Sequence, residues 1–84
     1  MNAEVETNTT APLKEIVAAV LHAYFQALDG QPAEKLYDMV IKEVELGLFK
    51  TVLAHTGGNQ SKAAEWLGLA RGTLRKRLAE YGIE

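Results

Sequence analysis

Hydrophobic residues recur every three or four positions over two long stretches of the chain, and this is the spacing of an amphipathic α-helix. The first stretch follows Pro12, which suits a first helical turn, and it stops before Gly30. The second continues to about His55, where the segment TGGN ends it. The pattern therefore predicts two long helices, over about 12–28 and 36–55.

Both stretches carry more hydrophobic surface than one buried face requires, because Ile16, Leu21 and Phe25 widen the first stripe. Two buried faces imply two partners, and in a short chain the simplest second partner is another copy. Gly47, inside the second helix, indicates a bend, close packing or a tolerated glycine. The predicted core of the homodimer is Val17, Val20, Tyr24, Leu36, Val40, Val44, Leu48 and Val52.

Two shorter helices fit the segments NQSKAAEWLG and ARGTLRKRLAEYG, with Asn59 as the N-cap of the first and Gly68 as its left-handed stop. The link GLA is so short that these helices must meet at a steep angle, as in a helix-turn-helix. Ala64 permits close approach, and no segment has a strand pattern. The predicted fold is all-α with four helices, and its C-terminal interior is sealed by Leu67, Leu69, Leu74 and Leu78.

The last predicted helix separates an apolar arc from a basic surface. Leu74, Leu78 and Tyr81 share the arc, while Gly72 lies roughly opposite them. Most charge runs are solvated helix faces. A helix that enters the major groove of DNA also needs an apolar back, a small residue for close approach and long cationic side chains. The preceding turn favours the second interpretation.

Composition and charge change this picture in two ways. The chain has 84 residues, 48% of them hydrophobic, and no Cys, so oligomerisation is the expected way to bury more surface. Its net charge is −2, but residues 1–56 carry four Lys against eight acidic groups, and residues 57–84 carry five basic against three acidic groups. Because salt screens charges beyond about 8–10 Å, a distant acidic half does not cancel a local basic patch.

Targeting signals and catalytic motifs are not evident in the sequence. The first eleven residues lack the pattern of a signal peptide, and no apolar run reaches the roughly 20 residues that span a bilayer. We expect a disordered tail over 1–11 and a cytoplasmic protein with no membrane partner. His22 and His55 have no second ligand at metal-binding spacing, and Glu43 and Glu45 lie on different helix faces. We therefore expect no enzyme, metal or cofactor.

The segment GNQSKAAEWLGLARGTLRKRLAEYGI is similar to the helix-turn-helix of the Fis family of small bacterial DNA-bending proteins. The upstream segments PLKEIVAAVLHAYFQALDGQ, LYDMVIKEVE and LGLFKTVLAHTGGNQ also resemble that family. The resemblance implies a single domain over 12–84: dimerisation helices over 12–56, and a DNA-binding part over 57–84 whose motif spans about 60–79. It further implies an intertwined homodimer that bends DNA, organises the nucleoid and regulates transcription.

Nine positions match the family motif and are expected to contact DNA. Arg71 is the expected base contact, most naturally to guanine, and Arg75 is expected to reach bases as well. Phosphate contacts are expected from Asn59, Ser61, Thr73, Lys76 and Arg77, and Gln60 and Lys62 complete the set. Trp66 and Tyr81 are expected to pack in the hydrophobic interior.

Three departures from the family pattern modify these expectations. Ala70 stands where the family has a polar residue, so the last helix should lack a side-chain cap. Gly57 replaces a basic residue of the loop before the motif, which weakens the expectation of contact with RNA polymerase. The tail before Pro12 is shorter than the family's N-terminal arm, which weakens the expectation of contact with a DNA recombinase.

Two other functions fit the same sequence. The helix-turn-helix is shared with the output domains of nitrogen-regulator type activators. Because the sequence starts with Met1 and has no ATPase domain before the helices, we expect a free-standing protein, and an open reading frame that continues upstream of Met1 would favour the activator. A helical dimerisation module whose basic end binds a protein is the second alternative. It predicts binding with little salt dependence, whereas DNA binding predicts a steep one.

Overall fold

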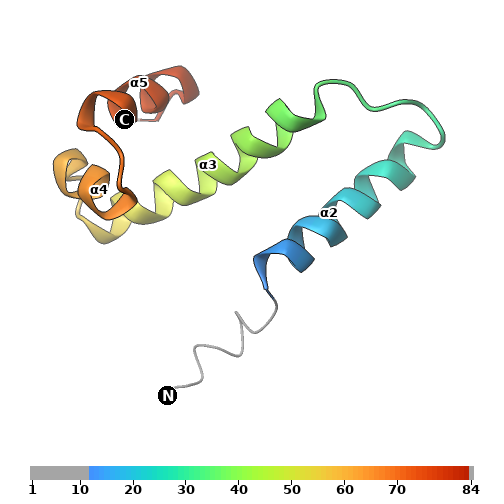
Figure 1. The fold of residues 1–84 in the computed structure, drawn as a ribbon, viewed down its shortest axis with the longest axis horizontal. Helices are drawn as coiled ribbons and strands as arrows, with labels where there is room; N and C mark the ends of the chain where they lie inside the picture. The colour runs from blue at the N-terminus through green and yellow to red at the C-terminus, as the bar shows by residue number, and fades with distance from the viewer. Residues whose placement is uncertain (1–11, 84) are drawn as a thin grey trace, which may run out of the picture. The chain divides into compact units, whose positions relative to one another are not determined.

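The structure is a computed structural model that describes residues 12–83. Helices and their connections account for this whole range, which contains no strand, and this confirms the predicted all-α fold (Figure 1). The disordered tail expected over 1–11 lies outside the described residues. The helices are α2 (Leu13–Leu28), α3 (Leu36–His55), α4 (Gln60–Leu67) and α5 (Arg71–Tyr81).

The chain forms two compact units, one up to Glu34 and one from Lys35 onward. The first contains α2, which ends at Asp29 in the left-handed conformation, with φ of 53°. No residue of α2 is buried within this chain. Four of its large apolar side chains are exposed, among them Leu13 at 66% and Val20 at 62%, and the others have intermediate exposure.

The second unit has a small hydrophobic core made by three helices. Phe49, Leu74 and Leu78 are its largest fully buried side chains. Partly buried residues pack around it, including Leu67 and Leu69 at the turn between α4 and α5. The predicted interior of the helix-turn-helix is therefore confirmed, and α3 also contributes buried side chains to it. The buried set is Phe49 and Leu53 from α3, Ala63 and Ala64 from α4, and Leu74 and Leu78 from α5.

The ends of the two short helices differ in how they are capped. The Asn59 side chain accepts a hydrogen bond from the Lys62 backbone N–H at 3.0 Å, and Gly68, with φ of 75°, ends α4. Both predictions for this helix are confirmed. Ala70 precedes α5 in an extended conformation and makes no side-chain cap, also as predicted. The first N–H groups of α5 therefore lack the partner that α4 has.

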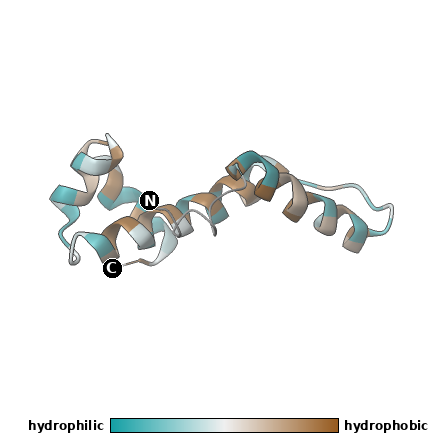
Figure 2. Ribbon diagram, turned by 90° about the horizontal axis from the view of Figure 1, so that it is seen from below, coloured by the Kyte–Doolittle hydropathy of each residue, from teal (hydrophilic) through white to brown (hydrophobic). Residues whose placement is uncertain are grey.

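The predicted dimer residues are only partly covered in a single chain. Val44 and Leu48 are exposed on α3, and Val20 is exposed on α2. Val52 is partly buried, because it packs against the core of α3, α4 and α5. Hydrophobic positions lie along the long helices as well as in the core (Figure 2). The remaining four, Val17, Tyr24, Leu36 and Val40, have intermediate exposure, and the role of the whole set in a dimer stays a prediction.

Trp66 and Gly47 both lie in more open surroundings than close packing within the chain would give them. Trp66 does not pack inside, because its side chain is 58% exposed. The buried face of α4 is taken by Ala63 and Ala64, and Trp66 lies beside this face, about 60° around the helix from Ala63 and about 160° from Ala64. At Gly47, α3 continues without interruption, and a Cβ atom would meet nothing within 4 Å. Close packing within the chain is therefore not the reason for this glycine.

Candidate nucleic-acid interface

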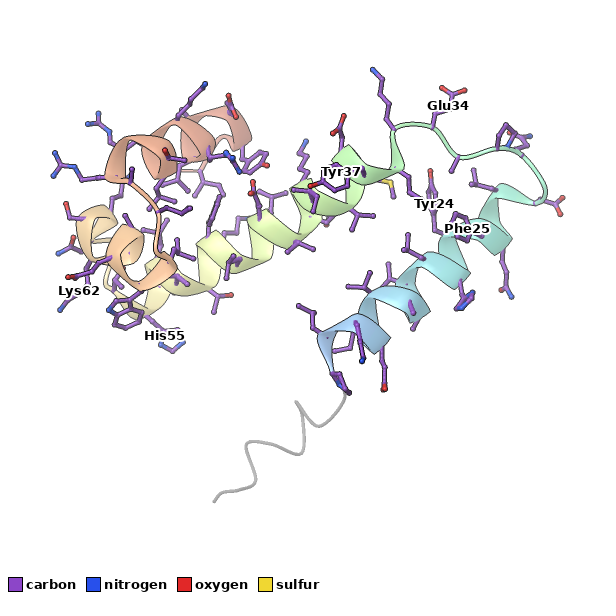
Figure 3. The ribbon with its side chains drawn as sticks, in the orientation of Figure 1. Tyr24, Phe25, Glu34, Tyr37, His55 and Lys62 are labelled. Atoms are coloured by element: carbon purple, nitrogen blue, oxygen red, sulfur yellow. The ribbon has the colours of Figure 1, made fainter. Side chains whose placement is uncertain are left out.

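The first turns of α4 and α5 come together on one exposed face of the second unit. Two shallow depressions adjoin each other on this face. Residues of both helices line the first, and the second continues from it over Lys62, Glu65 and Leu69. Lys62 projects outward from α4 at the edge of the unit (Figure 3). The first depression is lined by Asn59, Gln60, Ser61, Arg71 and Arg75.

This face exists because the opposite side of α5 is anchored in the core. Leu74 and Leu78 have exposures of 0% and 1%, so the helix cannot rotate without losing buried surface. Arg71 and Arg75 are one turn apart and both are exposed. Gly72, between them, is also exposed, and a Cβ atom there would meet nothing within 4 Å. Beside the two Arg side chains, the surface of α5 at Gly72 is therefore open.

Arg71 is connected to the other helix of the motif. Its Nη1 donates a hydrogen bond to Ser61 Oγ at 3.1 Å. The hydroxyl of Ser61 keeps its own hydrogen available for donation, and Arg71 keeps its remaining N–H donors. This hydrogen bond links the Arg71 side chain, at the start of α5, to Ser61 in the first turn of α4. The hydrogen-bond donors of the two helices therefore lie on the same face.

Six of the nine predicted positions thus lie in or beside the two depressions, and the other three are on α5 outside them. Thr73 and Lys76 are exposed but do not line either depression. Arg77 has turned toward α3, where its Nη1 binds Oε2 of Glu45 at 2.5 Å. The sequence therefore placed Arg77 on the correct helix but gave no indication of its partner.

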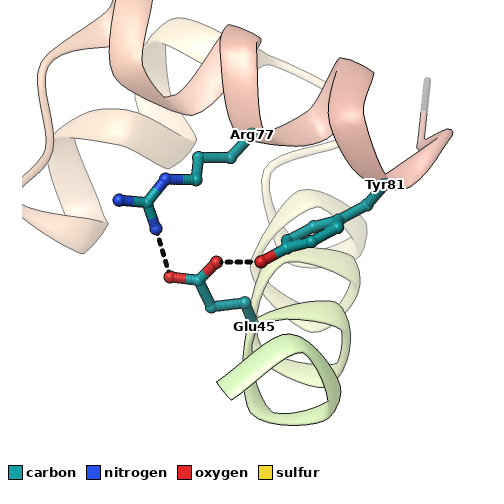
Figure 4. A network of polar contacts seen from close by, with 3 residues as sticks. All are labelled: Glu45, Arg77 and Tyr81. Atoms are coloured by element: carbon teal, nitrogen blue, oxygen red, sulfur yellow. Dashed lines mark hydrogen bonds and ion pairs between the residues drawn. The ribbon is translucent and has the colours of Figure 1, made fainter. Parts of the chain in front are cut away.

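Glu45 has a second partner on α5. The Tyr81 hydroxyl donates to Oε1 of the same carboxylate, so that both carboxylate oxygens are bound (Figure 4). This hydrogen bond, together with partial burial and the negative charge of Glu45, raises the pKa of Tyr81 above its usual value. The expected hydrophobic packing of Tyr81 is present too, since it packs against the core. Its hydroxyl contact was not expected from the sequence.

The comparisons with known proteins point to one family. The model described as "Bacterial regulatory protein, Fis family" matches residues 40–81. These residues run from α3 to the end of α5, and so include both the buried core and the exposed basic face. The chain belongs to the Fis family. The resemblance inferred from the sequence is confirmed.

Two curated Fis-family relatives cover most of the chain. A protein of Pseudomonas aeruginosa named "Putative Fis-like DNA-binding protein" is 47% identical over 98% of this chain and 85% of its own length. A protein of Xylella fastidiosa with the same name is 52% identical over 87% of this chain and 81% of its own length. The similarity thus extends beyond the motif into the region of α2, which the family model does not reach.

The described part of this Fis-family chain shows neither a metal site nor a membrane span. Among residues 12–83, no three His, Cys, Asp or Glu side chains are grouped so that they could hold a metal ion. None of the helices in this range is both long enough and apolar enough to cross a membrane.

Proposed function

We propose that this Fis-family chain binds double-stranded DNA and places α5 in the major groove. The observation that carries the proposal is the face on which Arg71 and Arg75 meet the first turn of α4. An apolar back anchors α5, and Gly72 leaves room for close approach to the bases. The names of the two relatives, both Fis-like DNA-binding proteins, support the same function.

The donors of the face divide into two roles. Arg71 and Arg75 carry planar guanidinium groups, which match the O6 and N7 acceptors of guanine in a bidentate way. Lys62 and Lys76 are point charges that suit phosphates. The Asn59 side-chain oxygen is used by the Lys62 backbone N–H, so its amide group is the part left to donate to a phosphate. Gln60, Ser61 and Thr73 add neutral donors, which position the protein on the backbone.

The functional form that we propose is a homodimer. Single large apolar side chains on a surface are ordinary, but α2 buries no residue and leaves a whole series of them exposed. A helix of this kind is stabilised by packing against a partner rather than by its own propensity. A second copy supplies a complementary face by symmetry. The dimer would carry two copies of α5 to the same duplex.

Two rigidly connected copies of α5 can both enter major grooves only if their spacing matches that of the duplex, or if the duplex bends. We propose that the DNA bends, and that recognition depends on its deformability more than on many base contacts. In this role the protein acts as a nucleoid-associated regulator of transcription in the bacterial cytoplasm. Contacts with RNA polymerase or a recombinase are not needed for this activity.

A salt titration tests the class of ligand. A duplex with an A/T-rich centre is titrated with the protein in gel-shift assays at several salt concentrations. If each protomer of the dimer places two or three cations on phosphates, the slope of log affinity against log salt should be about −4 to −5 for the dimer. A duplex competitor without the A/T-rich centre controls for non-specific binding. Binding that is absent, or that does not change with salt, would contradict the proposal and favour a protein partner.

A further inference from the structure

Glu45 connects α3 to α5 through two side chains of α5. Its Oε2 binds Arg77 Nη1 and its Oε1 accepts the hydrogen bond of Tyr81 Oη. The side chain of Glu45 is 17% exposed and that of Arg77 is 42% exposed. The carboxylate is therefore largely covered by the residues that it binds, whereas the guanidinium still reaches solvent.

The polar contacts stand beside an apolar contact between the same helices. The rings of Phe49 and Tyr81 are 6.4 Å apart and tilted by 32°. Burial of Leu74 and Leu78 already limits the rotation of α5, but apolar packing has less directional preference than a hydrogen bond. Hydrogen bonds are directional, and two bonds to one carboxylate add a further constraint on how α5 is turned relative to α3.

We propose that Glu45 is a positioning residue that fixes the orientation of α5 on α3 and withholds Arg77 from DNA. The inference rests on the proposed function, because it concerns how the DNA-binding helix is presented. Arg71 and Arg75 line the depression that α5 shares with α4, and Arg77 and Tyr81 do not line it. Arg77 is directed to the carboxylate of another helix and so contributes no phosphate contact.

The proposal makes Lys76 and Arg77 different in kind, although they are adjacent on one helix. Loss of Lys76, which the proposed function places on a phosphate, should reduce the slope of log affinity against log salt. Each lost phosphate contact changes that slope by about 0.9. Loss of Arg77 should leave the slope unchanged and lower the thermal midpoint instead, because the Glu45 carboxylate then loses one of its two partners.

Tyr81 provides a readout of the contact that does not involve DNA. Its hydroxyl faces Glu45, with Arg77 and Glu80 as the other charged groups near it. The raised pKa means that folding favours the protonated phenol. This contribution to stability is complete below the unfolded-state pKa of about 10, and it is lost as the pH rises from there through the folded-state pKa. Substituting Glu45 by Gln should bring the Tyr81 titration back toward its usual range.

The experiment compares Glu45→Gln with Glu43→Gln. Glu43 is an exposed residue of the same helix, so its substitution removes the same charge away from the contact. For each full-length variant, three quantities are measured: the thermal midpoint, the ultraviolet titration of Tyr81 taken by difference from Tyr81→Phe, and the salt slope of DNA binding. Arg77→Ala and Lys76→Ala are measured alongside, and Arg77→Lys tests rescue by a conservative change.

We expect Glu45→Gln to lower the thermal midpoint by roughly 2–8 °C, to lower the Tyr81 pKa and to steepen the salt slope by up to about 0.9 per protomer. Glu43→Gln should do none of these, and Arg77→Lys should restore part of the midpoint lost in Arg77→Ala. The proposal is overturned if the two Gln variants behave alike, or if Arg77→Ala reduces the salt slope as much as Lys76→Ala does. If the wild type does not bind DNA, the proposed function fails, and the midpoint and titration still test the contact between the helices.

Discussion

At the scale of single residues, two helix starts in the same motif are built differently. Asn59 closes the first turn of α4 through its hydrogen bond with the Lys62 N–H. Ala70, at the corresponding position of α5, has φ of −64° and ψ of 143°, which is the backbone conformation of a cap without an oxygen to act as one. Arg71, the next residue, is instead held through Ser61.

The substitution Ala70→Ser should therefore stabilise the protein. A serine hydroxyl at this position can accept from the free N–H groups of the first turn of α5, which is worth about 0.5–2 kcal/mol in the free energy of unfolding. Asn59→Ala provides the reverse experiment and should destabilise by a similar amount. Thermal or urea denaturation measures both. An unchanged midpoint for Ala70→Ser would show that α5 already satisfies these groups in another way.

At the scale of elements, the helices were predictable because their signals are local. Apolar spacing, Asn59 and Gly68 define bounds that agree with those of α2, α3 and α4, and the basic segment ARGTLRKRLAEYG contains α5. The contact of Glu45 with α5 was not predictable, because its partners are 32 and 36 residues away and no periodicity relates them. The contacts of Phe49 were not predictable either. Its position in α3 indicates an apolar face, but the spacing does not say which helix that face meets.

The exposure of Trp66 shows another limit of the pattern. An aromatic residue in a short amphipathic helix is usually part of the core, but the core side of α4 is filled by Ala63 and Ala64. Small residues there let α4 approach α3 and α5 closely. The signal for the buried face was therefore the pair of alanines rather than the largest apolar side chain.

Gly72 allows a test of how closely α5 approaches DNA. Ala at this position should stabilise the helix by roughly 0.5–1 kcal/mol, because a Cβ atom would meet nothing within the chain. The same methyl group should weaken DNA binding if bases or phosphates come close to Gly72. Gel shifts and thermal denaturation of Gly72→Ala measure the two effects separately. Equal or tighter binding by the more stable variant would place α5 farther from the duplex than proposed.

At the scale of the whole molecule, the main question is what covers the apolar surface of α2. Its side chains are arranged as a helical stripe, and none of them is buried in a single chain. The basic residues are concentrated in the second unit, whereas acidic residues prevail in the first 56 positions. A dimer formed through the acidic, apolar part leaves both basic faces free for a polyanion.

The substitution Val20→Glu should disrupt this dimer. Val20 is 62% exposed in the single chain and lies in the predicted dimer core, so a carboxylate there would be buried without a partner on association. Sedimentation or light scattering across a concentration series measures the change in mass. Ala19→Glu, an exposed position about 100° around α2, is the matched control. A dimer that tolerates Val20→Glu as well as Ala19→Glu would exclude this face as the interface.

The proposed DNA-binding function depends most directly on Arg71 as a contact to DNA. Affinity for one A/T-centred duplex at fixed salt is compared between the wild type, Arg71→Ala and Lys42→Ala. Lys42 is an exposed residue of α3, and its substitution removes the same charge outside the face. Loss of a bidentate base contact predicts that Arg71→Ala weakens binding by about 5-fold to 150-fold and Lys42→Ala changes it little. Equal effects of the two substitutions would contradict the claim that the α4 and α5 face binds DNA.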